Sequence, residues 1–115
     1  MLNTVLAETG PVSYVNLSPS LVGNYGEGPR LTYYKADVAL RVSSSLASDR
    51  VKHHEPLIRN ELVMLFAEQT DESLGSPDGK EELRQVALKR VQDVLLQEEG
   101  QQLVDDLLFN NLIIQ

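Results

Sequence analysis

The C-terminal segment constrains the fold of this chain more than any other feature. Residues 104–115 (VDDLLFNNLIIQ) stay apolar to the last residue, with large apolar side chains at Leu107, Leu108, Phe109, Leu112, Ile113 and Ile114. Chain ends usually fray, and an exposed apolar terminus would promote aggregation. The segment is therefore predicted to be a strand paired within a sheet, with at least one face buried. Two asparagines interrupt its alternation, which leaves open a β-bulge and the choice of inward face.

Length and composition fit one globular domain. The chain has 115 residues, of which 42% are hydrophobic and 23% charged, and this size supports a single core. We predict one domain over residues 11–115. Residues 1–10 are predicted to be a disordered arm or the remnant of an export signal. The reason is that Val5, Leu6 and Ala7 resemble the end of a cleavable signal whose basic start is missing.

Charge and cysteine content exclude several classes of protein. The formal net charge is -7, and lysines and arginines occur singly except at Lys89 and Arg90. A chain with this negative charge and no basic cluster is expected to bind poorly to nucleic acid and to an anionic membrane surface. No run of 18 apolar residues is present, so membrane contact is expected only through an anchor absent from this chain. Without cysteine there are no disulfides and no thiolate chemistry.

The first third of the chain is predicted to be β-structure. Residues 13–17 alternate weakly and are predicted to be a short strand, and residues 23–29, with three glycines and a proline, are predicted to be a turn. Residues 31–43 are the clearest strand. Its core face is predicted to carry Tyr34, Ala36, Val38, Leu40 and Val42, with Lys35, Asp37 and Arg41 on the wet face. Such alternation is typical of an antiparallel sheet.

Two long helices are predicted to follow. A short helical turn over residues 47–54, capped by Ser48 or Asp49, precedes a main helix that starts at Pro56. The buried stripe of the main helix is predicted to be Leu57, Ile58, Leu62, Leu65 and Phe66.

Residues 69–75 form a predicted polar hinge, and Ser76 and Pro77 start the second long helix, which ends at Gly100. Its buried stripe is Leu83, Ala87, Val91, Val94 and Leu95. The predicted fold class is α+β, with a small antiparallel sheet packed against two long helices.

No catalytic constellation emerges from the residue types and their spacing. His53 and His54, followed by Glu55, are the only histidines, and neighbouring helical side chains point too far apart to chelate one ion well. A small hydrolase or metal-dependent enzyme using these three residues is kept as a second hypothesis.

The neighbouring acids Asp105 and Asp106, and also Glu98 and Glu99, are interpreted as solvated carboxylates rather than acid/base pairs. The glycine-rich turn is followed by a strand rather than a helix, which disfavours a phosphate loop. We therefore predict no catalytic, cofactor-binding or metal-binding residues and no small-molecule substrate. The sheet edge, the acidic helix faces and the glycine loop remain candidate contact regions.

Four segments together resemble the periplasmic domain of the FliL family of flagellar basal body-associated proteins. The resemblance covers residues 14–115, and its segments are 34–40 (YKADVAL), 54–59 (HEPLIR), 79–84 (GKEELR) and 109–115 (FNNLIIQ). The order and spacing of the four segments support the resemblance more than any single segment does.

The resemblance implies a fold similar to the stomatin/prohibitin (SPFH) family and a non-enzymatic protein that assembles around the stator units of the flagellar motor. It further implies self-association into a ring or other homo-oligomer, contact with stator proteins, and a role in swimming and swarming. The implied location is the periplasm of a Gram-negative bacterium, at the inner-membrane basal body. A third hypothesis, an exported small α+β binding module unrelated to the flagellum, stays open.

Overall fold

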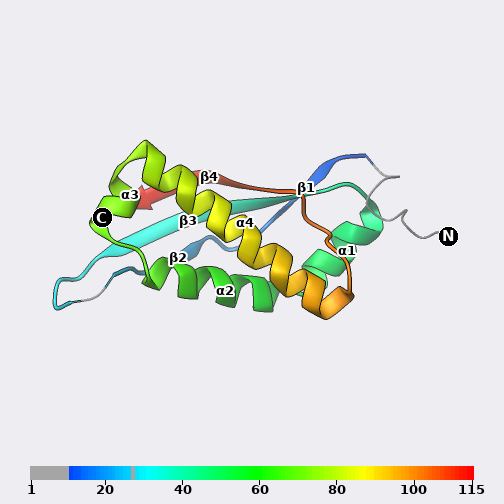
Figure 1. Ribbon diagram of the computed structural model, residues 1–115, viewed down its shortest axis with the longest axis horizontal. Coiled ribbons are helices and arrows are strands. Elements are labelled where there is room, and N and C mark those ends of the chain that lie inside the picture. The colour runs from blue at the N-terminus through cyan, green and yellow to red at the C-terminus, as the bar shows by residue number, and fades with distance from the viewer. Residues whose placement is uncertain (1–10, 27) are drawn as a thin grey trace.

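A four-stranded antiparallel sheet lies against a layer of helices in the computed structural model, which describes residues 11–26 and 28–115 (Figure 1). In chain order the elements are β1 (Ser13–Asn16), β2 (Leu21–Asn24), β3 (Tyr33–Val42), α1 (Ser45–His53), α2 (Glu55–Ala67), α3 (Asp71–Gly75), α4 (Pro77–Glu99) and β4 (Asp106–Ile114). The predicted α+β class with a small antiparallel sheet is confirmed. The predicted arm or signal remnant over residues 1–10 lies outside the described residues.

The sheet is organised around β3, which pairs with every other strand. β4 pairs with residues 34–41 of β3 along one edge. β1 and β2 pair with the two halves of β3, and therefore share its other edge. The predicted strand over residues 13–17 corresponds to β1. β2 was not predicted, because Gly23 and Asn24 had been assigned to the turn.

Glycine in β2 has a steric reason. Gly23 pairs with Tyr34, and a Cβ on Gly23 would lie 3.2 Å from the Cε1 and hydroxyl oxygen of the Tyr34 ring. The tyrosine ring occupies the space that a larger side chain would need. Gly23, which the sequence assigns to a turn, thus lies in a strand where the absence of a side chain makes room for the buried Tyr34 ring.

β4 is paired along its whole length and contains a bulge, so the predicted terminal strand is confirmed. Asp37 pairs with Asn111, but the next residue, Val38, pairs with Phe109, so Asn110 is the extra residue. The bulge reverses the alternation. As a result Leu107 and Phe109 before it, and Leu112 and Ile114 after it, all face the core.

The inner face of the sheet is the core. All five core-face residues predicted for the long strand are at most 2% exposed. The Tyr34 ring stacks on Phe66 with centroids 4.0 Å apart, and Phe66 meets Phe109 edge-on at 5.9 Å. This aromatic cluster joins β3, α2 and β4 into one packed unit.

The helical layer differs from the sequence prediction in several boundaries. Ser44, not Ser48 or Asp49, caps α1, and its hydroxyl accepts a hydrogen bond from the Ala47 N–H at 3.0 Å. α2 begins at Glu55, one residue before the predicted start, and Pro56 lies in its first turn. Leu57 was predicted to be buried, yet it is 44% exposed, because the core-facing stripe of α2 runs through Ile58, Leu62, Leu65 and Phe66.

Among the helices of residues 11–26 and 28–115, α4 is the only long one, so the predicted pair of long helices is not found. α4 has 23 residues, α2 has 13, and the predicted polar hinge over residues 69–75 contains the short helix α3, which has a capping box at Thr70 and Ser73. The start of α4 at Ser76 and Pro77 is confirmed. Its end at Gly100 is also confirmed, because Gly100 adopts a left-handed conformation with φ 76°. Val94 is half-buried rather than buried.

Candidate functional site

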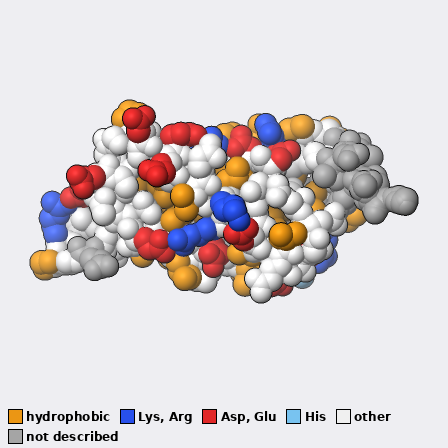
Figure 2. All heavy atoms as spheres, in the orientation of Figure 1, with side chains coloured by type: hydrophobic (Ala, Val, Ile, Leu, Met, Phe, Trp, Pro, Cys, Tyr) orange, Lys and Arg blue, Asp and Glu red, His pale blue; other side chains and the backbone are white. Residues whose placement is uncertain are grey.

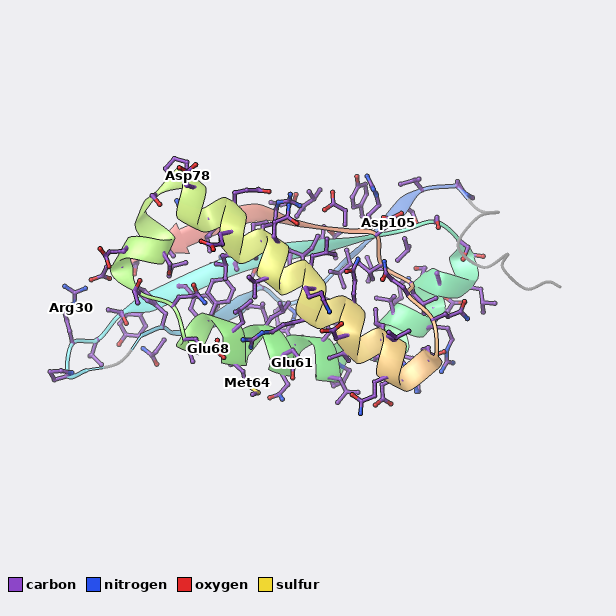
Figure 3. The ribbon with its side chains drawn as sticks, viewed as in Figure 1. Arg30, Glu61, Met64, Glu68, Asp78 and Asp105 are labelled. Carbon is purple, nitrogen blue, oxygen red and sulfur yellow. The ribbon has the colours of Figure 1, made fainter. Side chains whose placement is uncertain are left out.

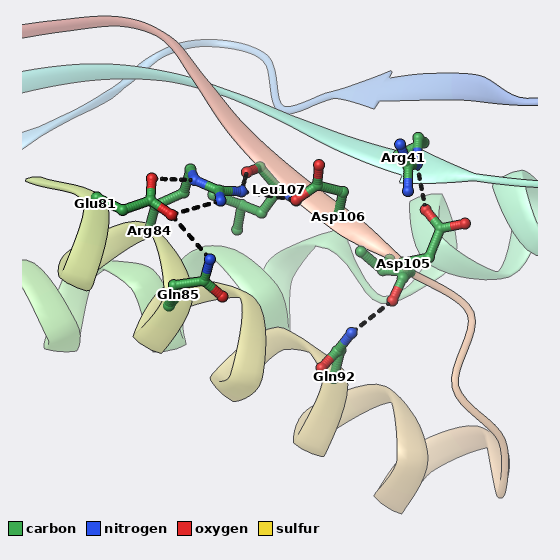
Figure 4. Close-up of polar contacts among 9 residues, drawn as sticks. Arg41, Glu81, Arg84, Gln85, Gln92, Asp105, Asp106 and Leu107 are labelled. Atoms are coloured by element: carbon green, nitrogen blue, oxygen red, sulfur yellow. Dashed lines mark hydrogen bonds and ion pairs between the residues drawn. The ribbon is translucent and has the colours of Figure 1, made fainter.

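A polar network joins α4 to β4 (Figure 4). The Arg84 guanidinium reaches from α4 to the Asp106 carboxylate at 2.7 Å and donates to the Leu107 carbonyl at 3.0 Å. It also pairs with Glu81 one turn earlier at 2.7 Å. Hydrogen bonds from Arg84 and from Gln85 lower the pKa of Glu81 to about 2. Arg84 thus fixes the helix to the edge strand.

The same network closes part of the β4 edge. The Leu107 N–H donates to the Asp106 carboxylate at 2.8 Å, while its carbonyl accepts from Arg84. The backbone groups that Leu107 turns away from β3 are therefore occupied by side chains. Next to this closed part lies a groove of about 400 Å³. It is lined by Pro77, Lys80, Glu81, Arg84, Leu108, Phe109, Asn110 and Leu112.

The neighbouring acids Asp105 and Asp106 serve different partners. Asp105 pairs with Arg41 of β3 at 2.6 Å, whereas Asp106 pairs with Arg84 (Figure 4). Each aspartate therefore has its own arginine partner. Asp105 ties the residue just before β4 to β3, and Asp106 links β4 to α4.

The second hypothesis requires His53, His54 and Glu55 to act together, and the structure separates them. His54 lies 2.5 Å from the Glu99 carboxylate, and Arg50 bonds the same carboxylate at 2.9 Å. The pKa of Glu99 is lowered to about 2, mainly by the hydrogen bonds from Arg50 and to a smaller extent by the hydrogen bond from His54. Glu55 instead pairs with Arg59 at 3.7 Å.

Two further candidate residues, His53 and Glu98, do not join the group formed by Arg50, His54 and Glu99. His53 is exposed and meets His54 only ring edge to ring face, at 4.9 Å. Glu98, the neighbour of Glu99, is exposed. Within the part of the chain that the structure describes, no three His, Asp or Glu side chains gather in a way that could hold a metal ion.

The hairpin between β2 and β3 contributes a polar cavity at one end of the molecule, where Figure 3 shows Arg30. The Tyr25 hydroxyl donates to Asp71 at 2.8 Å, and Arg30 pairs with the same carboxylate. The hydrogen bond from the Tyr25 hydroxyl is the largest cause that lowers the pKa of Asp71, and the hydrogen bond from Arg30 is the second. The cavity measures about 410 Å³ and is lined by Tyr25, Gly26, Arg30, Thr32, Glu68, Gln69, Thr70 and Asp71.

Two features of this cavity bear on the glycine loop. The Gly26 N–H donates to the Ala67 carbonyl at 3.1 Å and is not free for an anion. The adjacent first turn of α3 carries Asp71 and Glu72, whose negative charge repels a phosphate group.

Apolar side chains are exposed on both sides of the molecule. On the outer sheet face Tyr14, Val22, Tyr33 and Ile113 are each more than 40% exposed, and on α2 the same holds for Leu57, Val63 and Met64. Figure 2 shows acidic, basic and apolar side chains mixed over the helix-bearing face, and Figure 3 shows Met64 projecting from α2. These features define a small α+β domain whose candidate functional regions are grooves and surfaces.

Comparison with known proteins gives the family. The family model described as "Flagellar basal body-associated protein FliL" matches residues 14–115. A "Flagellar protein FliL" from Aquifex aeolicus (strain VF5) is 26% identical over 99 residues, which cover 86% of this chain and 59% of that relative. The chain belongs to the FliL family, and it spans 59% of the length of the curated relative it matches. The resemblance seen in the sequence is confirmed.

The comparisons thus identify the chain as a member of a family of flagellar basal body-associated proteins. None of the helices within residues 11–26 and 28–115 combines the length and apolar character of a membrane span.

Sequence reasoning missed most of the polar links in these regions. Arg84 lies within the segment 79–84 that carries the resemblance, but nothing in its neighbourhood points to Asp106, which is 22 residues away. Tyr25 and Asp71 are 46 residues apart, and Arg50 and Glu99 are 49 apart. Pairs within one helix are different, because i,i+3 and i,i+4 spacing is enough to indicate them. Glu55 with Arg59, Glu81 with Arg84 and Lys89 with Asp93 are three such pairs.

Proposed function

We propose that this chain is a non-enzymatic flagellar basal-body-associated protein that assembles around the stator units of the motor and stabilises them. In this role it supports flagellar rotation and therefore swimming and swarming. The proposal is carried by the family match over residues 14–115. Its partners are other copies of itself, in a ring or other homo-oligomer, and flagellar stator proteins. The proposed location is the periplasm, at the inner-membrane basal body.

The α+β fold is compatible with the stomatin/prohibitin-like architecture that we propose for this domain. Two observations support self-association. The outer sheet face exposes Val22 and Tyr33, and α2 exposes Val63 and Met64. Because the sheet and α2 belong to different layers, the two apolar surfaces face in different directions (Figure 1). Contact between two different surfaces of successive copies is a heterologous interface, which closes into a ring when the rotation is suitable.

The test is a gene deletion, complemented by the full-length gene and by two surface variants. Met64→Glu places a charge in the α2 surface, and Leu96→Glu makes the same change at a similarly exposed position on α4. The deletion should reduce swarming and swimming in viscous medium. Met64→Glu should behave like the deletion and lose the crosslinked oligomer seen with the wild type, whereas Leu96→Glu should complement. Unchanged motility in the deletion strain would contradict the role at the motor.

The alternative is an exported binding module unrelated to the flagellum. The polar cavity at the hairpin end, with Tyr25 and Asp71, would be its binding region. In that case the deletion would leave motility intact, and Asp71→Asn would alter only ligand binding.

A further inference from the structure

The two halves of the β4 edge differ in how their backbone groups are used. Tyr33 and Gln115 exchange two hydrogen bonds, at 3.0 and 2.9 Å. Because antiparallel pairs alternate, Ile113 and Asn111 also turn their N–H and C=O groups toward β3. The groups of Leu112 and Ile114 must then point away from the sheet. β3 is the one strand with which β4 pairs among the described residues, so this half of the edge is open.

The open half also leaves part of the core uncovered. In β3 the core-face residues Tyr34, Ala36 and Val38 are at most 2% exposed. Their neighbours in β4, Leu112 and Ile114, pack against the same core but are only partly buried. One more strand beside β4 would cover them, provided that every second side chain of that strand is apolar.

The groove beside this edge adds a charge requirement. Pro77 and Lys80, from the first turns of α4, line the groove together with Phe109 and Leu112. Within the described residues the Lys80 ammonium has no hydrogen bond or ion pair, whereas Glu81 is engaged by Arg84. A carboxylate on the incoming segment would neutralise Lys80. At the other end Arg84 and Asp106 close the edge at Leu107, which limits the segment to the length of residues 109–114.

We propose that residues 109–114 of β4 form a strand-addition site for an extended segment of a different polypeptide, with apolar side chains at alternate positions and an acidic residue facing Lys80. A second copy fits less well. Pairing of two β4 edges in one continuous sheet would keep both helical layers on the same side, so the first turns of both α4 helices would meet at the junction. An extended segment carries no helical layer. This site belongs to the β4 edge and does not depend on the motor role proposed above.

The test uses the full 115-residue chain, labelled with ¹⁵N, and the synthetic peptide acetyl-Glu-Thr-Val-Thr-Val-Thr-Val-amide. The peptide should shift the amide signals of Leu112, Ile114 and Lys80. The same peptide with N-methyl groups on alternate backbone nitrogens, placed to block donation to β4, should bind at least about tenfold more weakly.

Three variants sharpen the test. Lys80→Glu should weaken binding by about tenfold, through loss of the ion pair and new repulsion. Lys52→Glu makes the same charge change on α1 and should leave binding unchanged. Ile114→Pro removes one outward N–H donor without removing a bond to β3, and should also weaken binding; its thermal melt checks that it folds.

Some outcomes would overturn the proposal. These are no shifts at saturating peptide, shifts centred on other elements, or equal binding by the N-methylated peptide. Shifts of Leu112 and Ile114 that appear on concentrating the chain without peptide would assign the edge to a second copy instead.

Discussion

The inner and outer faces of the sheet both carry large apolar side chains, yet only the inner face is covered. Tyr34, Ala36 and Val38 are at most 2% exposed, whereas Tyr33 is 44% and Ile113 is 41% exposed. Neighbouring residues of one strand, Tyr33 and Tyr34, differ this much because successive side chains point to opposite faces. Hydrophobicity alone does not tell which of these residues are buried, and the register of the strand decides whether each lies in the core or on the exposed face.

The largest effect should come from removing residues 112–115. The truncation takes Leu112 and Ile114 off the inner face and removes the pairing of Tyr34 and Ala36 with β4. Each such side chain would contribute roughly 1.5–3 kcal/mol if fully buried, so these partly buried ones contribute up to that value, and the truncation also removes ladder hydrogen bonds; the total stability of a domain is about 5–15 kcal/mol. The truncated chain should be largely unfolded by circular dichroism. A cooperative melt near the wild-type temperature would show that the inner face does not need this half of β4.

Deleting Asn110 should be the next most damaging change. Without the bulge the two halves of β4 cannot both keep their core residues inward, so either Leu107 and Phe109 or Leu112 and Ile114 turn outward. Since only Leu107 of the four is fully buried, turning two of them outward should cost up to roughly 3–6 kcal/mol in urea unfolding. Asn111→Ala, at the adjacent exposed position, serves as the control and should stay within about 0.5 kcal/mol. If the deletion were as mild as the control, the register would not set the faces.

A smaller, pH-dependent effect is expected from Glu99, in the helical layer that covers the inner face. Arg50 and His54 lower its pKa from 4.5 to about 2 in the folded state. Its carboxylate therefore stabilises the fold above about pH 4.5, and this contribution is lost as the pH falls toward 2. Glu99→Gln should lower the melting temperature at pH 7, and the difference from wild type should vanish near pH 2. A difference that is the same at both pH values would exclude this electrostatic origin.

The smallest effect should come from the outer face. Ile113→Thr changes an exposed side chain and should alter the free energy of unfolding by no more than about 0.5 kcal/mol. The same substitution at Leu107, which is 0% exposed, should cost about 2–5 kcal/mol because it leaves a cavity and buries a hydroxyl. Denaturant titrations of the two variants compare the faces directly. Equal losses would mean that the outer face is also covered in solution.

Local patterns were sufficient to predict much of the fold. The core face of β3 followed from its alternation, and the α4 boundaries followed from Ser76, Pro77 and Gly100. These features depend on residues within a few positions of one another. Errors arose where a tertiary contact overrode the local pattern: Gly23 lies in a strand because of Tyr34, and Leu57 is exposed because α2 turns Ile58 and Leu62 toward the core.

The candidate sites were less predictable, because their partners lie far apart in sequence. Nothing local indicates that Arg84 closes the edge at Leu107 or that Asp71 accepts from Tyr25. The sequence also does not indicate which side chains of β4 point to the core, since period-two alternation fails across a bulge. Only the register with β3 shows that Asn110 is the extra residue.

The position of β4 in the chain has a consequence for the order of folding. β3 leaves the ribosome before α1, α2, α3 and α4, but β4, the strand that pairs with its open edge, is synthesised after α4. Until β4 emerges, the nascent chain holds a central strand with one bare edge and an unfilled inner face. The helices can form locally, but stable docking has to wait, because pairing across so long a stretch of chain is entropically costly and slow. The domain should therefore fold as a late, single event, and its nascent chain remains open to chaperones until then.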